Sequence, residues 1–338
     1  MSLTPLYGSG IVPASGAIAD QLTALTRRSF VYKLIVQIYN STPTLQMLLD
    51  NAQFATGGID PITVPVQGSS LTTFQWSGYS GTFNQPSDQP GATNAQATLK
   101  LGLVPIPFLG MEGAIQVDAA IIPIIEARMN DAMTVMKQGF ASAIYLNTAA
   151  LNNQAITGFK DAIDDGTNTD SYMGILRSAN PWWKAQYVAP GAINPTRALL
   201  LQYIAQLTKH GNELPTMATC NFGTWMQLAS DFLGLERYNQ SPGSGGFDTV
   251  NGAFQAIMVG GVPIYPDFFC AEGDFWFFNA NYLNLYIHNA AKFAFSGFHS
   301  AIPNFQIGFI GVMATILELV NAKPATSMHV TGLNYVNI

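Results

Sequence analysis

Hydrophobic side chains recur every three or four residues over a long stretch near the middle of the chain. From Ile122 to Ile144 their spacing is 3, 4, 4, 3, 4 and 4 residues, which places them on one face of an α-helix. The pattern predicts a helix from Pro123 to Asn147, about 37 Å long, with Pro123 in its first turn or at a kink. Its apolar face, which we expect to pack in a core, consists of Ile122, Ile125, Met129, Met133, Met136, Phe140 and Ile144.

The second half of the chain predicts an αβ unit followed by strands. One helix begins at Asn194-Pro195 and ends at His210-Gly211, and a second spans Phe222–Leu233 after the strand Thr216–Cys220. There is no internal repeat and no series of β-α-β units, so the predicted class is α+β. Further strands are predicted at Phe254–Val259, Val262–Tyr265, Phe275–Phe278, Tyr282–His288, Phe305–Val320 and Ser327–Leu333.

The chain begins with an arm that contains helical pieces. Ala17–Asn40 carries a small basic cluster among apolar residues, consisting of Arg27, Arg28 and Lys33. Ser41-Thr42-Pro43 predicts the start of a short helix, because a hydroxyl N-cap before proline is a common helix beginning. We expect this helix to end at Gly57-Gly58.

The segment Asn51–Leu99 is unusually polar and has only two charged residues, Asp60 and Asp88. Strand-like sequences flank it, at 62–66 and 97–103. A polar stretch this long is uncommon inside a compact domain. The segment could be a flexible loop or a projecting hairpin that contacts another subunit. Because a solvated linker seldom carries exposed aromatic rings, Phe74 and Trp76 favour the hairpin.

The composition points to a surface that faces other protein or is neutral and polar. Charged residues make up 10% of the 338 residues, against about 25% in ordinary soluble domains, and the net charge is −6.

The uncharged stretch 293–317 is long enough to span a bilayer. However, it contains Pro303, Asn304 and Gln306, so buried strands are the better interpretation.

The cellular compartment follows from the N-terminus and the cysteines. The N-terminus has no basic flank and no apolar core, so we expect no signal peptide. Two cysteines, Cys220 and Cys270, do not make a disulfide framework. The chain is therefore expected in the cytosol when it is made. Its net negative charge does not predict a basic surface that could bind nucleic acid.

The motifs that support enzymes are missing or incomplete. Gly243-Ser244-Gly245-Gly246 lacks the lysine of a phosphate-binding loop. The acidic run from Asp161 to Asp170 fails as a calcium loop, because Ile163 and Tyr172 stand where ligands are needed. No serine lies in a nucleophile elbow. The four histidines, His210, His288, His299 and His329, are scattered along the sequence, which argues against a zinc site. We therefore predict that the chain is not an enzyme and has no cofactor or metal site.

Several short stretches, taken in order, resemble one family. They are Asp164-Asp165-Gly166-Thr167, Tyr172-Met173-Gly174-Ile175-Leu176-Arg177-Ser178, Asn180-Pro181-Trp182-Trp183, Val259-Gly260-Gly261-Val262-Pro263-Ile264-Tyr265 and Phe275-Trp276-Phe277-Phe278-Asn279. With the arm, the charge-poor hairpin and the long helix, they resemble the major capsid proteins of tailed bacteriophages, which have the Hong Kong 97 fold. Met173 stands where the family often has glycine. The likeness covers most of residues 40–335.

The resemblance implies four parts and a function. Residues 1–56 would be an N-terminal arm, 57–107 an extended loop, 108–188 with 305–338 a peripheral domain around a spine helix, and 189–304 an axial domain. The chain would form pentamers and hexamers of an icosahedral head in the host cytoplasm. Its partners would be portal, scaffold and decoration proteins, and the shell would enclose double-stranded DNA without specific binding.

Two alternatives stay open beside a phage capsid. One is an encapsulin-like compartment that holds a cargo enzyme, and the other is a soluble hydrolase with a long lid at 57–103. The residues that we expect at subunit interfaces are Phe74, Trp76, Arg177, Trp182, Trp183, Gly243, Gly245 and Gly246. The three glycines are included because the resemblance places Ser241–Gly246 near a symmetry axis, where one loop must adopt more than one conformation.

Overall fold

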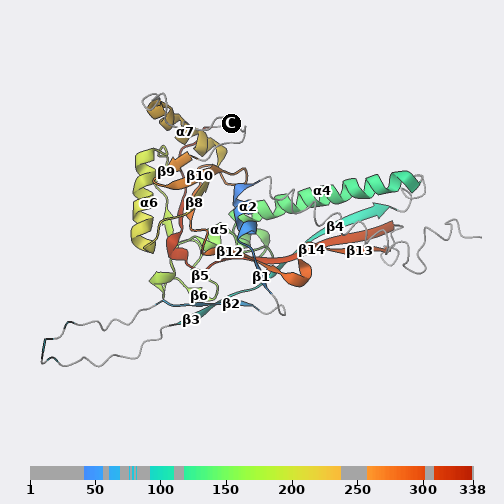
Figure 1. Cartoon of the computed structure of the whole chain (residues 1–338), viewed down its shortest axis with the longest axis horizontal. Helices are drawn as coiled ribbons and strands as arrows, with labels where there is room; N and C mark the ends of the chain where they lie inside the picture. Colours follow the sequence, from blue (N-terminus) through green and yellow to red (C-terminus); the bar gives the residue numbers. More distant parts are fainter. Residues whose placement is uncertain are drawn as a thin grey trace, which may run out of the picture.

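The described part of the chain has two large sheets, two small two-stranded sheets and a long helix, and a hairpin protrudes from it (Figure 1). The computed structural model describes residues 42–55, 61–68, 76, 78, 79, 81, 92–109, 118–236, 257–300 and 308–336. The long helix and one sheet extend to one side, and the second sheet with two helices lies at the other end. None of the described helices is long and apolar enough to cross a membrane.

The first sheet is built around one long central strand, β14 (Gly308–Asn321). β4 (Lys100–Leu109) pairs antiparallel with β14 along one side, from Lys100 opposite Leu317 to Leu109 opposite Gly308. On the other side of β14 lie, one after the other, β12 and β13, and β1 adds to β12 in parallel. The bounds of these strands are Leu283–His288 for β12, Ala294–Ser300 for β13 and Gln53–Ala55 for β1.

The long helix α4 (Asp118–Tyr145) packs on one face of this sheet. Its buried side chains include Met133 and Met136, and the half-buried Phe140 lies next to them. Gly102 of β4 allows the close approach, because a Cβ atom there would lie only 3.3 Å from the Phe140 ring. The apolar face that the spacing predicts therefore does form the core between helix and sheet.

The second sheet has six short strands and two helices. β8, β10 and β11 lie at its centre, and all four residues of β11 are completely buried, as expected for a strand covered on both faces. The strand order is β7 (Gln186–Val188), β15 (Met328–Val330), β11 (Phe275–Phe278), β8 (Met217–Cys220), β10 (Val262–Pro266) and β9 (Ile257–Val259). The helices are α6 (Arg197–Gly211) and α7 (Phe222–Glu236).

Smaller elements connect the two sheets. They are the helices α2 (Pro43–Asp50) and α5 (Phe159–Ala162), the pair β2 (Ile62–Val66) and β3 (Thr93–Ala97), and the pair β5 (Ser171–Tyr172) and β6 (Ile175–Leu176). The short 3-10 helices span Thr148–Leu151, Pro181–Trp183, Asn289–Ala291 and Pro324–Thr326.

Most predicted elements are confirmed, with differences at their ends. The long helix begins earlier, at Asp118, so Pro123 lies within its first two turns. The expected strand 97–103 is confirmed at 100–103, where β4 begins, but Ala97 belongs to the separate strand β3. The first short helix ends at Asp50 and is followed by β1, so it does not run on to Gly57-Gly58.

Strand pairing also differs from the division into parts that the resemblance implied. The expected boundary at 304/305 separates β13 from its hydrogen-bonded neighbour β14. Conversely, β15 pairs with β11 and β7 of the second sheet. The four-part division remains a prediction, but sheet membership groups 283–300 with β14 and 328–330 with β11.

A buried carboxyl group lies within β14. Glu318 is only 1% exposed, one oxygen accepts the Thr157 N–H at 2.8 Å, and the other oxygen has no described hydrogen-bond partner. Burial raises the pKa of Glu318 from 4.5 to about 7, since removal from water disfavours the charged form. The carboxyl group is therefore protonated more readily in the folded than in the unfolded chain.

Glu318→Gln should change how stability depends on pH. The raised pKa means that the contribution of Glu318 is fully present below about pH 4.5 and is lost as the pH rises to about 7, by up to about 1.4 kcal/mol per pH unit. The glutamine side chain cannot ionise and keeps an acceptor for Thr157. In urea unfolding, the free energy of unfolding of the variant should rise relative to that of the native chain between pH 4.5 and 8. A constant difference between the two chains over this pH range would contradict the prediction.

Candidate functional site

A buried arginine organises the loop between α5 and β7. The Arg177 guanidinium donates to the carbonyl oxygens of Thr169 (2.7 Å) and Asp161 (2.7 Å), and it lies 4.0 Å from an Asp164 carboxylate oxygen. Both charged side chains are completely buried. Burial lowers the pKa of Arg177, and Tyr172 and Asp164 act in the opposite direction; a guanidinium keeps its proton under such conditions.

Asp164 is satisfied by the same loop. One carboxylate oxygen accepts the backbone N–H groups of Gly166, Asn168 and Thr169 at 2.9–3.1 Å. The Asn168 amide donates to the other oxygen at 2.8 Å. A buried ion pair is stable only where its remaining donors and acceptors are also used. The turn meets that condition for Asp164, whereas the Arg177 Nε has no described hydrogen-bond partner. The acidic run is therefore an internal brace of the loop.

Aromatic rings continue this brace towards the hairpin. Tyr172 stacks on Trp183, with ring centroids 5.8 Å apart, and the Arg177 guanidinium lies 5.0 Å from the Tyr172 centroid. The Trp183 indole N–H donates to the Tyr172 carbonyl at 3.1 Å, and the Tyr172 hydroxyl accepts the Asn321 N–H at 2.8 Å. Trp182 meets Trp183 edge to face at 5.5 Å.

The β2–β3 hairpin is held at its base by this aromatic group. The Gln96 N–H of β3 donates to the Met173 carbonyl at 2.9 Å. Met173 has φ +51°, so the tight turn between β5 and β6 turns this carbonyl outward at a residue where glycine would be easier. Gly68, just after β2, lies against the Trp182 ring so closely that a Cβ atom would overlap with it. We call these contacts the hairpin base.

The far end of the hairpin exposes aromatic side chains. Trp76 is 91% exposed and Tyr79 is fully exposed, on either side of Gly78, whose carbonyl accepts the Gly81 N–H at 3.0 Å. The strands β2 and β3 lead away from the body of the molecule (Figure 1). Two large rings at the end of a projecting element suit contact with another molecule.

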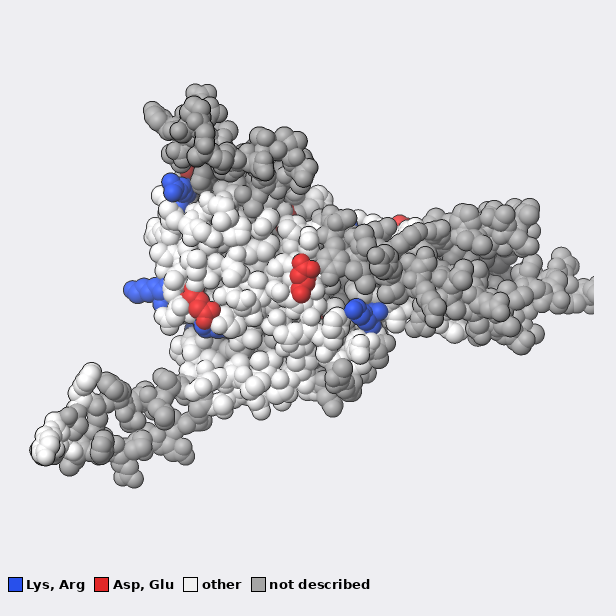
Figure 2. Space-filling view, viewed as in Figure 1, with Lys and Arg blue, Asp and Glu red and all other residues white. Residues whose placement is uncertain are grey.

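A second apolar surface is the face of the first sheet that α4 does not cover. Leu101 and Leu103 are 53% and 55% exposed, and Pro105 and Pro107 are exposed beside them. Their partners across the ladder are the half-buried Ile316, Ala314, Val312 and Ile310 of β14. We call these eight residues the outer sheet face. Elsewhere the surface is also poor in charge, as the view in Figure 2 shows for the described residues.

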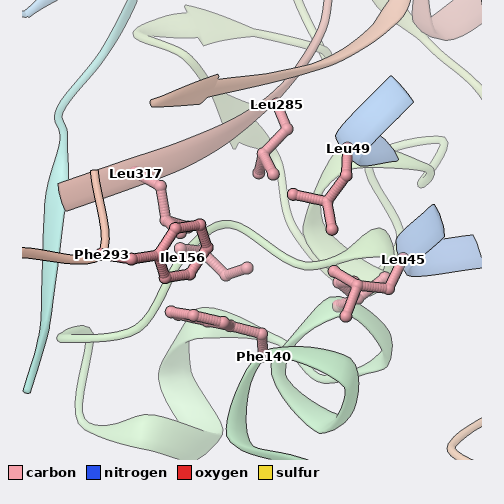
Figure 3. A pocket seen from close by; sticks show the side chains of 8 residues that line it. Leu45, Leu49, Phe140, Ile156, Leu285, Phe293 and Leu317 are labelled. Atoms are coloured by element: carbon pink, nitrogen blue, oxygen red, sulfur yellow. The ribbon is translucent and has the colours of Figure 1, made fainter. Parts of the chain in front are cut away.

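The cavity beneath α2 does not offer a ligand site. Leu45 and Leu49 point towards Phe140, Phe293 and Leu317 across a space of about 10 Å³ (Figure 3). That volume is at the limit for a single water molecule, and the lining is entirely apolar. The cavity is a packing defect where α2 joins α4 and the first sheet.

The groups that could perform chemistry are either dispersed or already used. Among the described residues no three His, Cys, Asp or Glu side chains form a cluster that could hold a metal. Cys220 and Cys270 are buried, and burial raises the pKa of both thiols, which disfavours the reactive thiolate. His329 lies 3.5 Å from Asp274 but is stacked on Trp276 inside the second sheet.

The structure revises part of the expected interface. Arg177 and Trp183 are completely buried within the chain, so we correct the expectation that they touch a neighbouring subunit: they support the hairpin base. Trp182 is half-buried against Gly68, and Trp76 is exposed as expected. The remaining predicted residues, Phe74, Gly243, Gly245 and Gly246, lie outside the described residues.

Sequence reasoning missed the outer sheet face. A signal was present in the sequence. Apolar residues stand at both odd and even positions of β14, and Pro105 and Pro107 stand at alternate positions of β4. The first pattern indicates a strand that is covered on both faces. Among the described elements, α4 covers one face only, and Leu101 and Leu103 on the other face are exposed.

Comparison with known proteins identifies the fold. No family model matches the chain, and no curated protein does. Among solved structures, the chain is similar to a subunit of the cyanophage A-1(L) capsid, with a TM-score of 0.67, 14% identity and coverage of 87% of this chain and 93% of the other.

Two other solved structures show the same likeness. The capsid subunit of a native GTA particle matches with a TM-score of 0.55, 9% identity and coverage of 85% and 90%. The SrpI encapsulin of Synechococcus elongatus PCC 7942 matches with a TM-score of 0.54, 10% identity and coverage of 88% and 91%.

Arg177→Met should destabilise the fold by about 3–5 kcal/mol, because Asp164 and the carbonyls of the loop would lose their buried cation. Arg197→Met is the matched control, since Arg197 is exposed in the first turn of α6 and exposed substitutions usually change stability by less than about 0.5 kcal/mol. Chemical denaturation measures the free energy of unfolding of both variants. Equal stabilities would show that the ion pair does not brace the loop.

Gly68→Ala should loosen the hairpin base while the rest of the fold is kept, because the new methyl group overlaps with the Trp182 ring. The amide of Gln96 should then exchange with deuterium faster, as its bond to Met173 opens. Gly78→Ala is the control, since a Cβ atom there meets nothing within 4 Å. Unchanged exchange over residues 92–99 in Gly68→Ala would refute the anchoring role of Trp182.

Proposed function

We propose that this chain, whose fold is the Hong Kong 97 fold of the capsid and encapsulin subunits described above, assembles with copies of itself into a closed shell. The shell is the head of a tailed bacteriophage, and the chain is its major capsid protein. The observation that carries the proposal is the combination of this fold with a projecting hairpin whose end exposes Trp76 and Tyr79.

The apolar surfaces support assembly on energetic grounds. Burial of apolar surface contributes about 25 cal/mol per Å², and the outer sheet face and the hairpin end offer such surface on opposite sides of the molecule. Surfaces of different kinds on one chain make head-to-tail contacts, which form rings where the rotation between successive copies closes. The low charge, 10% of residues, suits interface cores, where charged groups are depleted.

A phage head and an encapsulin compartment share this fold, so the choice between them needs other evidence. The cyanophage capsid has the higher TM-score, 0.67 against 0.54 for the encapsulin. Neighbouring genes for portal and terminase proteins would decide for the head, and a neighbouring cargo enzyme would decide for the compartment. The hydrolase alternative gains no support from the sites described above.

In the head, the chain holds double-stranded DNA by confinement. Its net charge of −6 makes salt-dependent phosphate binding weak, and we propose no DNA contact for the basic cluster of Arg27, Arg28 and Lys33. Portal, scaffold and decoration proteins complete the virion. The loop with Gly243, Gly245 and Gly246 lies at the axes of pentamers and hexamers, with the freedom of glycine to suit both.

Trp76→Ser should leave the subunit folded, because the ring is 91% exposed in the single chain and exposed substitutions usually change stability little. It should reduce shell formation, because it removes an aromatic ring that a neighbour can contact. Trp76→Phe is the control and should largely restore assembly, since it keeps an apolar ring. Circular dichroism checks the fold and electron microscopy counts closed particles. Normal particle yield from Trp76→Ser would contradict the role of the hairpin end.

A further inference from the structure

A short loop after α4, residues 152–157, is fixed at both of its ends, and we call it the strap. Before the strap, the Thr148 hydroxyl donates to the Asp161 carboxylate at 2.6 Å. After the strap, Gly158 packs so closely on the Leu146 carbonyl that a Cβ atom at Gly158 would overlap with it. Between these points the strap lines an apolar groove of about 280 Å³, together with α4 and the beginning of β4. The position of the strap therefore sets the width of this groove.

Two hydrogen bonds hold the strap against the first sheet. The ammonium group of Lys100, the first residue of β4, donates to the Asn153 carbonyl at 3.2 Å. The Thr157 N–H donates to one oxygen of Glu318 in β14 at 2.8 Å. The two sheet residues are neighbours, because Lys100 lies opposite Leu317 in the ladder between β4 and β14. One basic and one acidic side chain, next to each other, therefore hold the same loop.

The strap begins with two residues in an uncommon backbone conformation. Asn152 and Asn153 have φ angles of +54° and +58°, in the left-handed region that residues other than glycine seldom adopt. Such conformations persist where surrounding contacts hold them. Here the contacts are the bonds of the two N–H groups to the carbonyls of Ala149 and Thr148, at 3.3 and 2.9 Å, and the bond from Lys100 to the Asn153 carbonyl. Loss of the bond from Lys100 would therefore loosen the beginning of the strap.

Glu318 is the group beneath the strap that changes its charge near neutral pH. Its second oxygen is buried and has no described hydrogen-bond partner. A neutral carboxyl group tolerates this, whereas a buried carboxylate needs a cation or further donors. Burial raises the pKa of Glu318 to about 7, and the bond from Thr157 and the charge of Lys100 act in the opposite direction. Above this pH the second oxygen therefore requires a partner that it lacks below it.

The other described groups around Glu318 keep their charge state between about pH 5 and 8. Lys100 of β4 is the cation. Tyr286 of β12 lies directly across the ladder from Glu318, and Tyr172 of β5 interacts with Glu318 electrostatically. Burial raises the pKa of both tyrosine hydroxyls, so they stay neutral. Arg177, which lies over the Tyr172 ring, keeps its proton, and the strap itself has no ionisable side chain.

We propose that the strap is a pH-sensitive device: when Glu318 loses its proton to solvent, its second oxygen binds the Lys100 ammonium, which leaves the Asn153 carbonyl, and the strap loosens. The exchange is favourable because a bond between ammonium and carboxylate is stronger than one to a neutral carbonyl. It needs little movement, since Lys100 and Glu318 are neighbours in the sheet and the lysine stem is flexible. The groove then widens at neutral to basic pH and narrows at acidic pH. The inference goes beyond shell formation and does not depend on it.

Hydrogen exchange of the full chain, resolved to single amides, tests the device at about pH 6 and about pH 8, with each rate divided by the intrinsic rate at that pH. The amides of Asn152, Asn153 and Gln154 should lose about tenfold in protection at the higher pH, the weight of one hydrogen bond to a charged group. The Thr157 amide should stay protected, because its acceptor becomes a carboxylate. Equal protection of the first three amides at both pH values would overturn the inference. A loss that includes Thr157 would show that the loop opens as a whole and would overturn it too.

Three variants assign the pH step to its two groups. Glu318→Gln cannot ionise and keeps an acceptor for Thr157, so its strap should stay protected at both pH values. Lys100→Met lacks the donor to Asn153, so its strap should be poorly protected at both. Lys209→Met removes an exposed lysine of α6 and is the control, which should keep the step of the native chain. Circular dichroism confirms the fold of all three. A step like that of the native chain in Glu318→Gln or in Lys100→Met would overturn the inference, because the step would then belong to another group.

Discussion

The structure depends on one constraint: β14 carries apolar side chains on both faces, while over residues 309–317 the described part of the chain covers only one of them. α4 buries the face with Met313 and Leu317. The opposite face, with Ile316 and the β4 residues Leu101 and Leu103, stays accessible. In water such a sheet is stable as a single subunit only at the cost of exposed apolar area. A second molecule on that face removes the cost, which is why we interpret the chain as one part of an assembly.

The hairpin is the complementary feature, and its direction is set far from its end. The buried pair of Arg177 and Asp164 fixes one loop, the loop fixes Tyr172 and Trp183, and Trp182 then holds Gly68. Each step is a contact between completely or half-buried groups, so the base of the hairpin is as well defined as the core. A well-defined base sets the place where the hairpin leaves the body of the molecule, so that every copy projects its hairpin from the same point.

The sequence was sufficient for elements whose pattern is long and regular. The seven apolar residues from Ile122 to Ile144 predicted α4, and the alternation at Tyr282–His288 predicted β12. It was not sufficient where partners are distant in the chain. Nothing local shows that β15 joins β11 or that β13 pairs with β14, because hydrogen bonds between strands leave little trace in one sequence. For the same reason Arg177 and Trp183 were taken for interface residues: a motif marks importance, and only the fold shows that they are buried.

The central claim is that surfaces left open by one chain are covered by its copies. Hydroxyl-radical footprinting of the free subunit and of assembled particles measures this for each side chain in solution. The account predicts that oxidation of Trp76, Leu101 and Leu103 falls several-fold on assembly, while the completely buried Trp183 is protected in both states. Equal oxidation of Trp76, Leu101 and Leu103 in the subunit and in the particle would contradict it.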